Sequence, residues 1–397
     1  MLPLYHVPPG GWVDFPLPAC EALPMLLLIP GPVTTRPEVR AAMAQDLAPW
    51  DNDFRTFLVR LRERILRAAG GVAGTHSVLP LQGCGHFITE AAVRSLVPPS
   101  GKLLVPDTGA YSQRMIRLAR EAGRSVIALP IDAHHPTSPN VVAAALTADP
   151  AITHVGVVYS ETGSGVIHDA TAIGPVVRAA GRRMIVDGVS AFGALPLDLS
   201  TQPEIDAVVF TSNKCIEALP GVGFAIARID ALAANAGNAG SWSFDLNDVH
   251  LRSDGGSFRF TPPAQVLAAF DRAMDFWEQE GQPARLARYT ANMRVFYDGM
   301  VGLGLTPWLS RDAQGPIIVA IHAPADPAWD LQRFVDALKR RGVLISNFFN
   351  TPTPTFRVGC IGAITPDDMA GAVAAMADAM DEMGIKQRER VRDEVRS

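Results

Sequence analysis

The chain alternates short apolar runs with segments of helical pattern, and this alternation restricts its fold more than any other feature. Each run has the length of a strand and a continuous apolar centre, which is typical of a strand buried on both faces of a parallel sheet. The helix-like segments between them, such as residues 170–181, would cover the two faces of that sheet. The sequence therefore predicts an α/β fold. The apolar runs are residues 126–130, 153–158, 183–187, 207–210 and 222–227.

The pattern changes near residue 264, where two long helical segments lead into a shorter series of strands and helices. This second part predicts a smaller α+β domain, joined to the first by the long helices. At 397 residues the chain is long enough for two such domains. The predicted division is an N-terminal arm rich in proline (1–24), a large domain (25–280), a small domain (281–385) and a charged tail (386–397).

Composition excludes several classes of protein. With 48% hydrophobic and 19% charged residues, the chain is typical of a globular protein rather than a disordered one. Its formal net charge of −5 gives no reason to expect nucleic acid as a partner. No apolar run approaches the roughly 20 residues that a membrane span needs. The four cysteines form no CxxC pair and no zinc-like spacing with histidine, so we expect no metal site and a reducing, cytoplasmic setting.

Lysine is rare in this chain, which has only four lysines among 35 basic residues. Three of them lie in sequence that suggests solvent: Lys102 in a turn, Lys339 at a helix end and Lys386 in the charged tail. Lys214 instead lies between the apolar run 207–210 and a Pro-Gly break. A lysine kept where arginine is otherwise preferred suggests a task that needs a neutral amine, namely nucleophilic attack.

A lysine that forms a Schiff base needs an anion site and an acidic partner for an electron sink, and the sequence offers candidates for both. Residues 79–96 predict a strand, a glycine turn and a helix that begins near Cys84, where backbone N–H groups suit a phosphate. Asp187 ends a buried strand, at the edge where ligands collect in open α/β sheets. Because Asp187 and Lys214 end consecutive strands, both should lie at the same edge.

Taken singly, each of these signals has an ordinary alternative. Residues 79–96 would also suit a plain strand-to-helix turn, and Asp187 would also suit a helix cap or a turn. Thr162 and Ser164 follow the strand before Asp187 and add polar groups at that edge. Arg357, one arginine among many, would by itself be a surface residue of a strand. Without further information, the residues alone therefore do not decide whether these positions form an active site.

Eight motifs, taken together and in this order, resemble the class V, fold-type-I pyridoxal-phosphate aminotransferases over about residues 25–385. Within that family they are most similar to the members that act on 2-aminoethylphosphonate and pyruvate. The motifs are LLLIPGPVTTRPEVRAAMAQDLAPWDNDF, LQGCGHFITEA, DTGAYSQR, VVYSETGSGVI, IVDGVSAFGALPLD, TSNKCIEALPGVGFAIAR, RFTPPAQVLAAF and FRVGCIGAI.

The resemblance implies a pyridoxal 5′-phosphate cofactor and a role for each residue around its ring. It implies that Lys214 carries the cofactor as a Schiff base and later moves the proton, and that Asp187 pairs with the pyridine nitrogen. It also implies that Tyr111 lies beside or over the ring and that Thr162 contacts its hydroxyl side.

The resemblance further implies how the phosphate and the substrate are held. Arg357 would grip the substrate carboxylate, with Pro32 of the loop 30–35 beside the substrate. The family is dimeric, so a homodimer with sites between the subunits is expected, in which Thr261 reaches the partner's phosphate. The residues expected at the phosphate within one chain are Cys84, Gly85 and His86.

The implied activity is transfer of an amino group from 2-aminoethylphosphonate to pyruvate, which yields phosphonoacetaldehyde and L-alanine. Three departures from the motifs of those members bear on the substrate: GCGHF replaces GSGTF, ETGSG replaces ETTTG, and VGCIGA replaces IGNIGE. They leave open an alanine– or serine–glyoxylate type of aminotransferase and a lyase on a related aminophosphonate. A scaffold that binds the cofactor without catalysis is a further alternative, against which the intact Lys214 and Asp187 argue.

Overall fold

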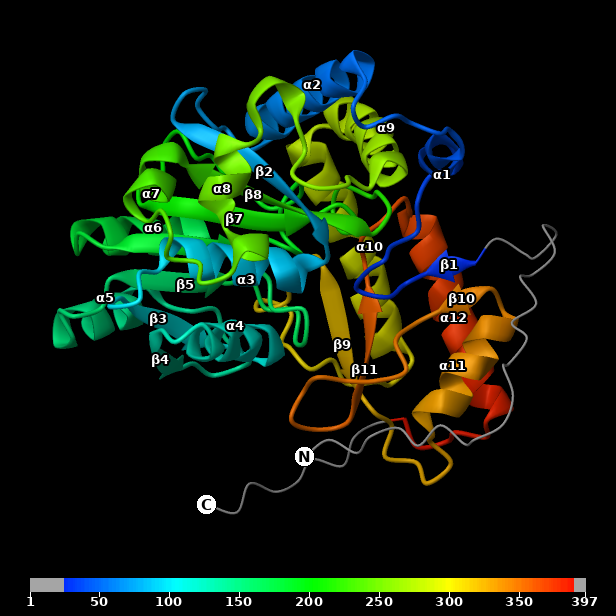
Figure 1. Ribbon diagram of the computed structural model, residues 1–397. Helices are drawn as coiled ribbons and strands as arrows, with labels where there is room; N and C mark the ends of the chain where they lie inside the picture. The colour runs from blue at the N-terminus through cyan, green and yellow to red at the C-terminus, as the bar shows by residue number, and fades with distance from the viewer. Residues whose placement is uncertain (1–24, 389–397) are drawn as a thin grey trace, which may run out of the picture.

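The structure is a computed structural model that describes residues 25–388. The arm expected over 1–24 lies outside the described residues, as does the part of the charged tail from residue 389 onward. The described chain forms a large central sheet with helices on both faces, beside a smaller assembly of helices and two short sheets (Figure 1). The α/β class predicted from the sequence is confirmed.

The central sheet has seven strands in the order β2-β8-β7-β6-β5-β3-β4. Both faces of its centre are apolar, because side chains alternate along each strand and every position of β5 and β7 is buried, whereas the edge strand β4 is partly exposed. In β7, for example, Val208 and Phe210 belong to the core on one face, and Ala207 and Val209 belong to the core on the other. The strands are β2 (His76–Gly83), β3 (Lys102–Asp107), β4 (Ser125–Pro130), β5 (His154–Val158), β6 (Arg183–Asp187), β7 (Ile205–Thr211) and β8 (Gly221–Arg228).

Strands β3 to β7 run parallel to their neighbours, which gives the mainly parallel sheet that the apolar runs predicted. The last run of that series (222–227) differs, because β8 pairs antiparallel with both β7 and β2. Residues 212–220 join β7 to β8 without a helix and are too few for the crossover that a parallel connection needs. The chain therefore turns back at the edge of the sheet, and Lys214 lies in this turn.

Helices cover both faces of the sheet (Figure 1). Helices α2, α5, α6 and α9 pack on one face, and α3, α4, α7 and α8 pack on the other. The helices are α2 (Asn52–Ala68), α3 (Gly85–Leu96), α4 (Ala110–Glu121), α5 (Pro139–Ala148), α6 (Ala170–Ala179), α7 (Ile229–Ala234), α8 (Leu246–Leu251) and α9 (Ala264–Glu280). Shorter segments are α1 (Pro37–Ala41) and the 3-10 helices Ala42–Ala44, Trp242–Phe244 and Asp254–Gly256.

The C-terminal part has a hydrophobic core of its own, in which β9 and β11 form an antiparallel pair. Leu28 belongs to this core, because β1 (Leu26–Leu27) pairs parallel with β10. The N-terminal end of the described chain thus packs with the C-terminal part, while the division at residues 280 and 281 stays a prediction. The elements are α10 (Gln282–Gly302), β9 (Ile318–His322), α11 (Leu331–Arg340), β10 (Val343–Leu344), β11 (Thr355–Gly359) and α12 (Pro366–Glu382).

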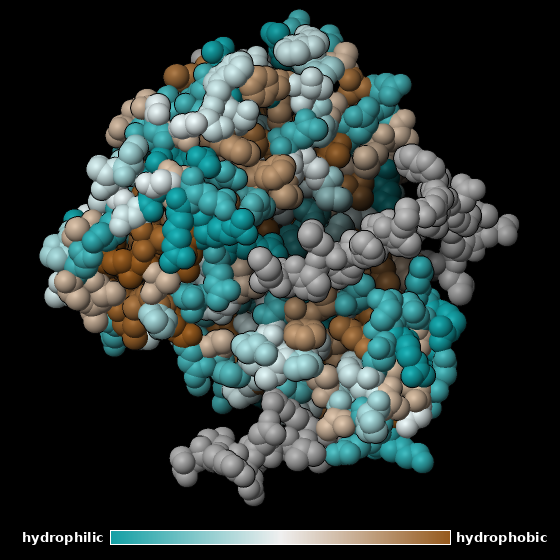
Figure 2. Space-filling model, turned by 60° about the horizontal axis from the view of Figure 1, so that its bottom comes forward, coloured by the Kyte–Doolittle hydropathy of each residue, from teal (hydrophilic) through white to brown (hydrophobic). Residues whose placement is uncertain are grey.

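Most of the surface visible in Figure 2 is hydrophilic, and apolar side chains gather on the side where Figure 1 places α5 and β4. Within residues 25–388, no helix is both long and apolar enough to cross a membrane. The same part of the chain contains no group of three or more histidine, cysteine, aspartate or glutamate residues placed to hold a metal ion.

Candidate active site

The carboxyl ends of three parallel strands lie next to one another at one edge of the central sheet. Strands β5, β6 and β7 are neighbours and run in the same direction. Asp187 is the last residue of β6, and Lys214 lies in the turn after β7. Thr162 and Ser164 follow β5. The fold thus brings to one edge the polar residues that the sequence predicted there.

A cavity of about 220 Å³ lies at this edge, between the sheet and helices α3 and α4. Asp187 and Lys214 line it together with four more residues expected from the sequence, Cys84, Gly85, His86 and Tyr111. The wall also contains residues that sequence reasoning missed, among them Thr89, Arg114 and Thr211. Arg114 was accessible to prediction, because it follows Tyr111 by three positions and so shares its helix face.

Asp187 presents a buried carboxylate to this cavity. Its Oδ1 accepts a hydrogen bond from the backbone N–H of Val189 at 3.0 Å, and its Oδ2 accepts one from the Thr89 hydroxyl at 3.5 Å. Burial raises the pKa of Asp187 to about 6, against the lowering effect of these hydrogen bonds and of the nearby Lys214. A partner with a positive charge is therefore the natural occupant beside this group.

Lys214 supplies an amine whose proton is weakly held. Its Nζ donates a hydrogen bond to the Pro30 carbonyl oxygen at 2.6 Å. Burial, together with the positive charge of Arg357, lowers its pKa to about 8, against the raising effect of Cys215 and Asp187. Gly31 makes the close packing possible, because a Cβ at this position would lie 2.7 Å from Lys214 Nζ. An amine of this pKa is partly neutral near pH 7 and can attack a carbonyl carbon.

The first turn of α3 offers an anion site at the other end of the cavity. Cys84 is the N-cap residue, and no side chain caps this end of the helix. Gly85 lets the helix lie close to the end of β6, since a Cβ there would be 2.9 Å from the Val189 side chain. The free N–H groups and the helix dipole of such a terminus attract phosphate.

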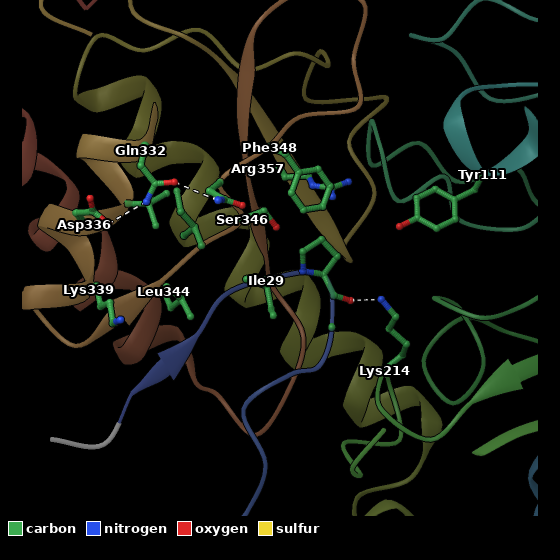
Figure 3. A pocket seen from close by; sticks show the side chains of 15 residues that line it. Ile29, Tyr111, Lys214, Gln332, Asp336, Lys339, Leu344, Ser346, Phe348 and Arg357 are labelled. Carbon is green, nitrogen blue, oxygen red and sulfur yellow. Dashed lines mark hydrogen bonds between the residues drawn. The ribbon is translucent and has the colours of Figure 1, made fainter. Parts of the chain in front are cut away.

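A second cavity of about 410 Å³ adjoins the first, and Gly31, Tyr111 and Lys214 line both (Figure 3). Arg357 of β11 lies in its wall with a side chain that is 2% exposed. Its Nη1 donates to the Thr162 carbonyl oxygen at 3.0 Å, and its guanidinium lies 4.7 Å from the centre of the Phe348 ring. Its Nε is buried and has no hydrogen-bond partner among the described residues. That free edge suits a bound carboxylate or phosphonate.

Three residues expected at the site do not line either cavity in a single chain. The Thr162 hydroxyl lies 2.8 Å from the Ser190 hydroxyl, and Thr162 contributes its carbonyl to Arg357 instead. Pro32 follows Gly31, but only Gly31 forms part of the wall. Thr261 is exposed and lies outside both cavities. Thr162 thus supports Arg357 in the wall of the larger cavity, whereas Thr261 lies away from both cavities of its own chain.

Residues 60–346 match the model of the aminotransferase class-V family. The chain belongs to the class-V aminotransferases. It is 44% identical over 365 residues to 2-aminoethylphosphonate–pyruvate transaminase 2 of Burkholderia lata, an alignment that covers 91% of this chain and 96% of that protein. It is 42% identical to a transaminase of the same description from Cupriavidus pinatubonensis, with coverage of 91% and 96%.

A solved structure supports the family and the fold. Pyridoxamine–pyruvate aminotransferase from Mesorhizobium loti superposes with a TM-score of 0.83 at 27% identity, over 93% of this chain and 95% of that one. The protein is thus a pyridoxal-phosphate-dependent aminotransferase of fold type I.

The residues around the smaller cavity fit this cofactor. A buried carboxylate suits a protonated pyridine nitrogen, an amine of lowered pKa suits an aldehyde, and the open end of α3 suits a phosphate. The buried Thr211 hydroxyl has no partner among the described residues, which leaves one more polar group in the wall for a ligand.

Borohydride reduction of the cofactor-loaded protein should attach pyridoxal phosphate to Lys214, because among the lysines of the described residues only Lys214 lines the smaller cavity, and its pKa is lowered. Lys214→Ala and Lys214→Arg should lose both the attachment and transamination, since arginine stays protonated at working pH. Mass spectrometry of the digested protein identifies the labelled peptide. Lys102→Ala is the control, because Lys102 does not line the cavity and its Nζ forms an ion pair with Asp149 Oδ2 at 2.7 Å. A label on another lysine, or normal turnover by Lys214→Ala, would contradict the assignment.

Proposed function

We propose that the protein transfers the amino group of 2-aminoethylphosphonate to pyruvate, which gives phosphonoacetaldehyde and L-alanine. The observation that carries this proposal is the buried Arg357, which lines a cavity together with Lys214 and whose Nε has no hydrogen-bond partner among the described residues. Each of the two substrates has one anionic group and one reacting carbon, so a single arginine can bind them in turn. The curated relatives named for this reaction support the same pair of substrates.

The cofactor supplies an electron sink for the carbon next to the donor nitrogen and carries the amino group between the two substrates. In this proposal Lys214 Nζ would hold the cofactor through its aldehyde and, when free, would move a proton as general base and acid. The ionised Asp187 carboxylate would keep a proton on the pyridine nitrogen; burial raises the pKa of Asp187 to about 6, and a positively charged ring nitrogen beside it would lower that pKa again. Tyr111 lies beside the ring, at the junction of the two cavities.

The geometry of Arg357 favours a two-point contact with the substrate anion. Nη1 is already bonded to Thr162, whereas Nε has no partner among the described residues and remains as an unpaired donor for the ligand. The Phe348 ring packs against the guanidinium and limits its rotation. Burial lowers the pKa of Arg357, but an arginine keeps its charge under such shifts. A fixed, desolvated cation of this kind selects for an anionic substrate.

His86, which belongs to the GCGHF motif that replaces GSGTF, is an argument for the glyoxylate-type alternatives. The position of this residue in the structure weakens that argument. His86 lines the smaller cavity at the start of α3 and is absent from the wall of the cavity that contains Arg357. We therefore assign His86, with Cys84 and Gly85, to the cofactor phosphate rather than to the donor. The donor remains 2-aminoethylphosphonate in preference to alanine or serine.

A half-reaction without keto acid tests this choice of donor. Each amine is mixed with the cofactor-loaded protein, and loss of the absorbance of the Lys214-bound cofactor is followed in a stopped-flow instrument. We expect 2-aminoethylphosphonate to convert the cofactor at concentrations at least tenfold lower than alanine or serine, because two arginines, Arg114 and Arg357, face the joined cavities. Efficient conversion by alanine or serine, with no change from the phosphonate, would favour the glyoxylate-type enzyme. Slow conversion of the cofactor by every amine would favour a scaffold that binds the cofactor without catalysis.

Arg357→Lys should raise the KM for pyruvate at least tenfold, which corresponds to about 1.4 kcal/mol, because a point charge replaces a planar two-point contact. The half-reaction with the phosphonate donor should suffer less, since a tetrahedral anion accepts a single ammonium donor more readily. Arg333→Lys is a control on an exposed arginine of α11. Equal losses in both half-reactions would mean that Arg357 binds both substrates alike or supports the fold.

We also propose a homodimer in which Thr261 reaches the cofactor phosphate of the partner subunit. Thr261 follows Phe260, which is 49% exposed and packs edge-on against Trp242, itself 63% exposed, at 5.1 Å between ring centres. Exposed aromatic residues beside a shallow cavity of about 450 Å³ suit a protein interface.

The cytoplasm is the location we propose; Cys84, Cys215 and Cys360 carry free thiols, and cell fractionation would test it.

Trp242→Glu should raise the dissociation constant of the dimer at least tenfold, because a charge replaces an aromatic side chain in the proposed interface. Sedimentation velocity measures the association, and a cofactor titration should give a weaker affinity in the same variant. Val141→Glu introduces the same charge at an exposed apolar residue of α5 and should leave both properties unchanged. A wild-type protein that sediments as a monomer while binding cofactor tightly would refute the dimer.

A further inference from the structure

Next to the turn that carries Lys214 lies a cluster of two glutamates, two arginines and a tyrosine, of which one glutamate, one arginine and the tyrosine are buried and the other two are partly exposed. We call it the Glu217 network; its members are Glu217, Glu280, Arg285, Arg288 and Tyr289. Glu217 Oε1 accepts hydrogen bonds from Arg288 Nη2 at 2.7 Å and from the Tyr289 hydroxyl at 2.6 Å. Glu280 accepts from the Nε atoms of Arg285 and Arg288, at 2.8 and 2.7 Å. Two carboxylates thus balance two guanidinium groups.

The network fixes the backbone of the Lys214 turn directly. The backbone N–H of Glu217 donates to the Lys214 carbonyl oxygen at 2.9 Å and closes the turn. Arg285 Nη1 donates to the Cys215 carbonyl oxygen at 2.7 Å, one residue from the lysine. Glu217 has a φ of 63°, in the left-handed region that is unfavourable for a residue with a side chain. The hydrogen bonds of its carboxylate to Arg288 and Tyr289 oppose relaxation of this residue to another conformation.

The same network reaches the segment after β11, the strand that carries Arg357. Arg288 Nη1 donates to the carbonyl oxygens of Gly362 and Ile364, at 2.7 and 3.0 Å. Helix α10 therefore holds the Lys214 turn and the end of β11 in one arrangement. Lys214 and Arg357 themselves line the same cavity wall, so this arrangement sets the distance between amine and anion site.

Stability alone is a weak reason for such a cluster. Arg285 is fully buried, and burying ion pairs of this kind often gives no net stability over apolar side chains of similar volume. We propose that the Glu217 network is a positioning element for the reaction, which holds the Lys214 turn so that its amine meets the cofactor aldehyde at a fixed point. The inference rests on the role given to Lys214 under the proposed function and is independent of the identity of the donor.

Tyr289→Phe tests the proposal, with Tyr297→Phe as its matched control. Both tyrosines are buried on α10, and each substitution removes one hydroxyl: Tyr289 donates to Glu217, whereas Tyr297 donates to the Leu309 carbonyl oxygen at 3.0 Å. The measurement is the rate at which pyridoxal phosphate attaches to the cofactor-free protein, as a function of pH. No amine donor is present, so a wrong donor assignment cannot affect the result.

We expect similar losses of melting temperature in the two variants, and slower attachment in Tyr289→Phe alone, by at least fivefold. The pH midpoint of its attachment should also rise by at least half a unit, because a looser turn admits water to Lys214. The charged groups that act on Lys214, namely Asp187, Arg357 and Arg114, are the same in both variants, as is the Cys215 thiol. A shift in Tyr289→Phe therefore reports the position of the lysine.

Glu217→Gln is a second variant, in case Tyr289→Phe does not fold. The amide keeps the length of the side chain and its acceptor oxygen, and attachment should again slow at least fivefold. Wild-type attachment rates in the folded variants, or equal slowing in Tyr297→Phe, would overturn the proposal. Attachment that persists in Lys214→Ala would instead refute the role of Lys214 and leave the network without a lysine to position.

Discussion

The site depends first on the parallel alignment of β5, β6 and β7, which ends three strands at one edge of the sheet. Asp187 and Lys214 are far apart in the sequence, yet this alignment makes them two walls of one cavity. The reversal at β8 adds the second condition, because it keeps the Lys214 turn short and at the edge. Without both features the amine and the carboxylate would not face a common ligand.

Charge in the joined cavities is arranged for anionic ligands. Lys214, Arg114 and Arg357 face them with positive charge, and the open end of α3 adds its dipole. Glu161 lies behind this layer and is fully buried; its carboxylate accepts hydrogen bonds from the backbone N–H groups of Tyr111 and Ser112 at the start of α4. Burial raises its pKa to about 6. Its function is to hold α4, and with it the Tyr111 ring, beside the cofactor cavity.

The sequence predicted the parts of this arrangement that local patterns determine. Buried strands are continuous apolar runs, and residues at their ends, such as Asp187 and Lys214, can be identified without tertiary information. The antiparallel direction of β8, the packing of Leu28 with the C-terminal core and the Glu217 network depend on contacts between distant segments. No local pattern predicts those contacts. Thr261 is different again, because a single chain leaves it exposed.

The division of labour between arginine and lysine explains why this chain keeps so few lysines. The buried cations that hold the structure are arginines: Arg64 bonds Asp271, Asp275 and Glu278 between α2 and α9, and Arg285 supports the Lys214 turn. A guanidinium offers several fixed donors and keeps its charge when buried, which suits these tasks and the binding of a substrate anion. Amino-group transfer also needs one cation that can lose its proton within the site. Of these two residue types only lysine meets that need, and the turn after β7 is where the fold provides it.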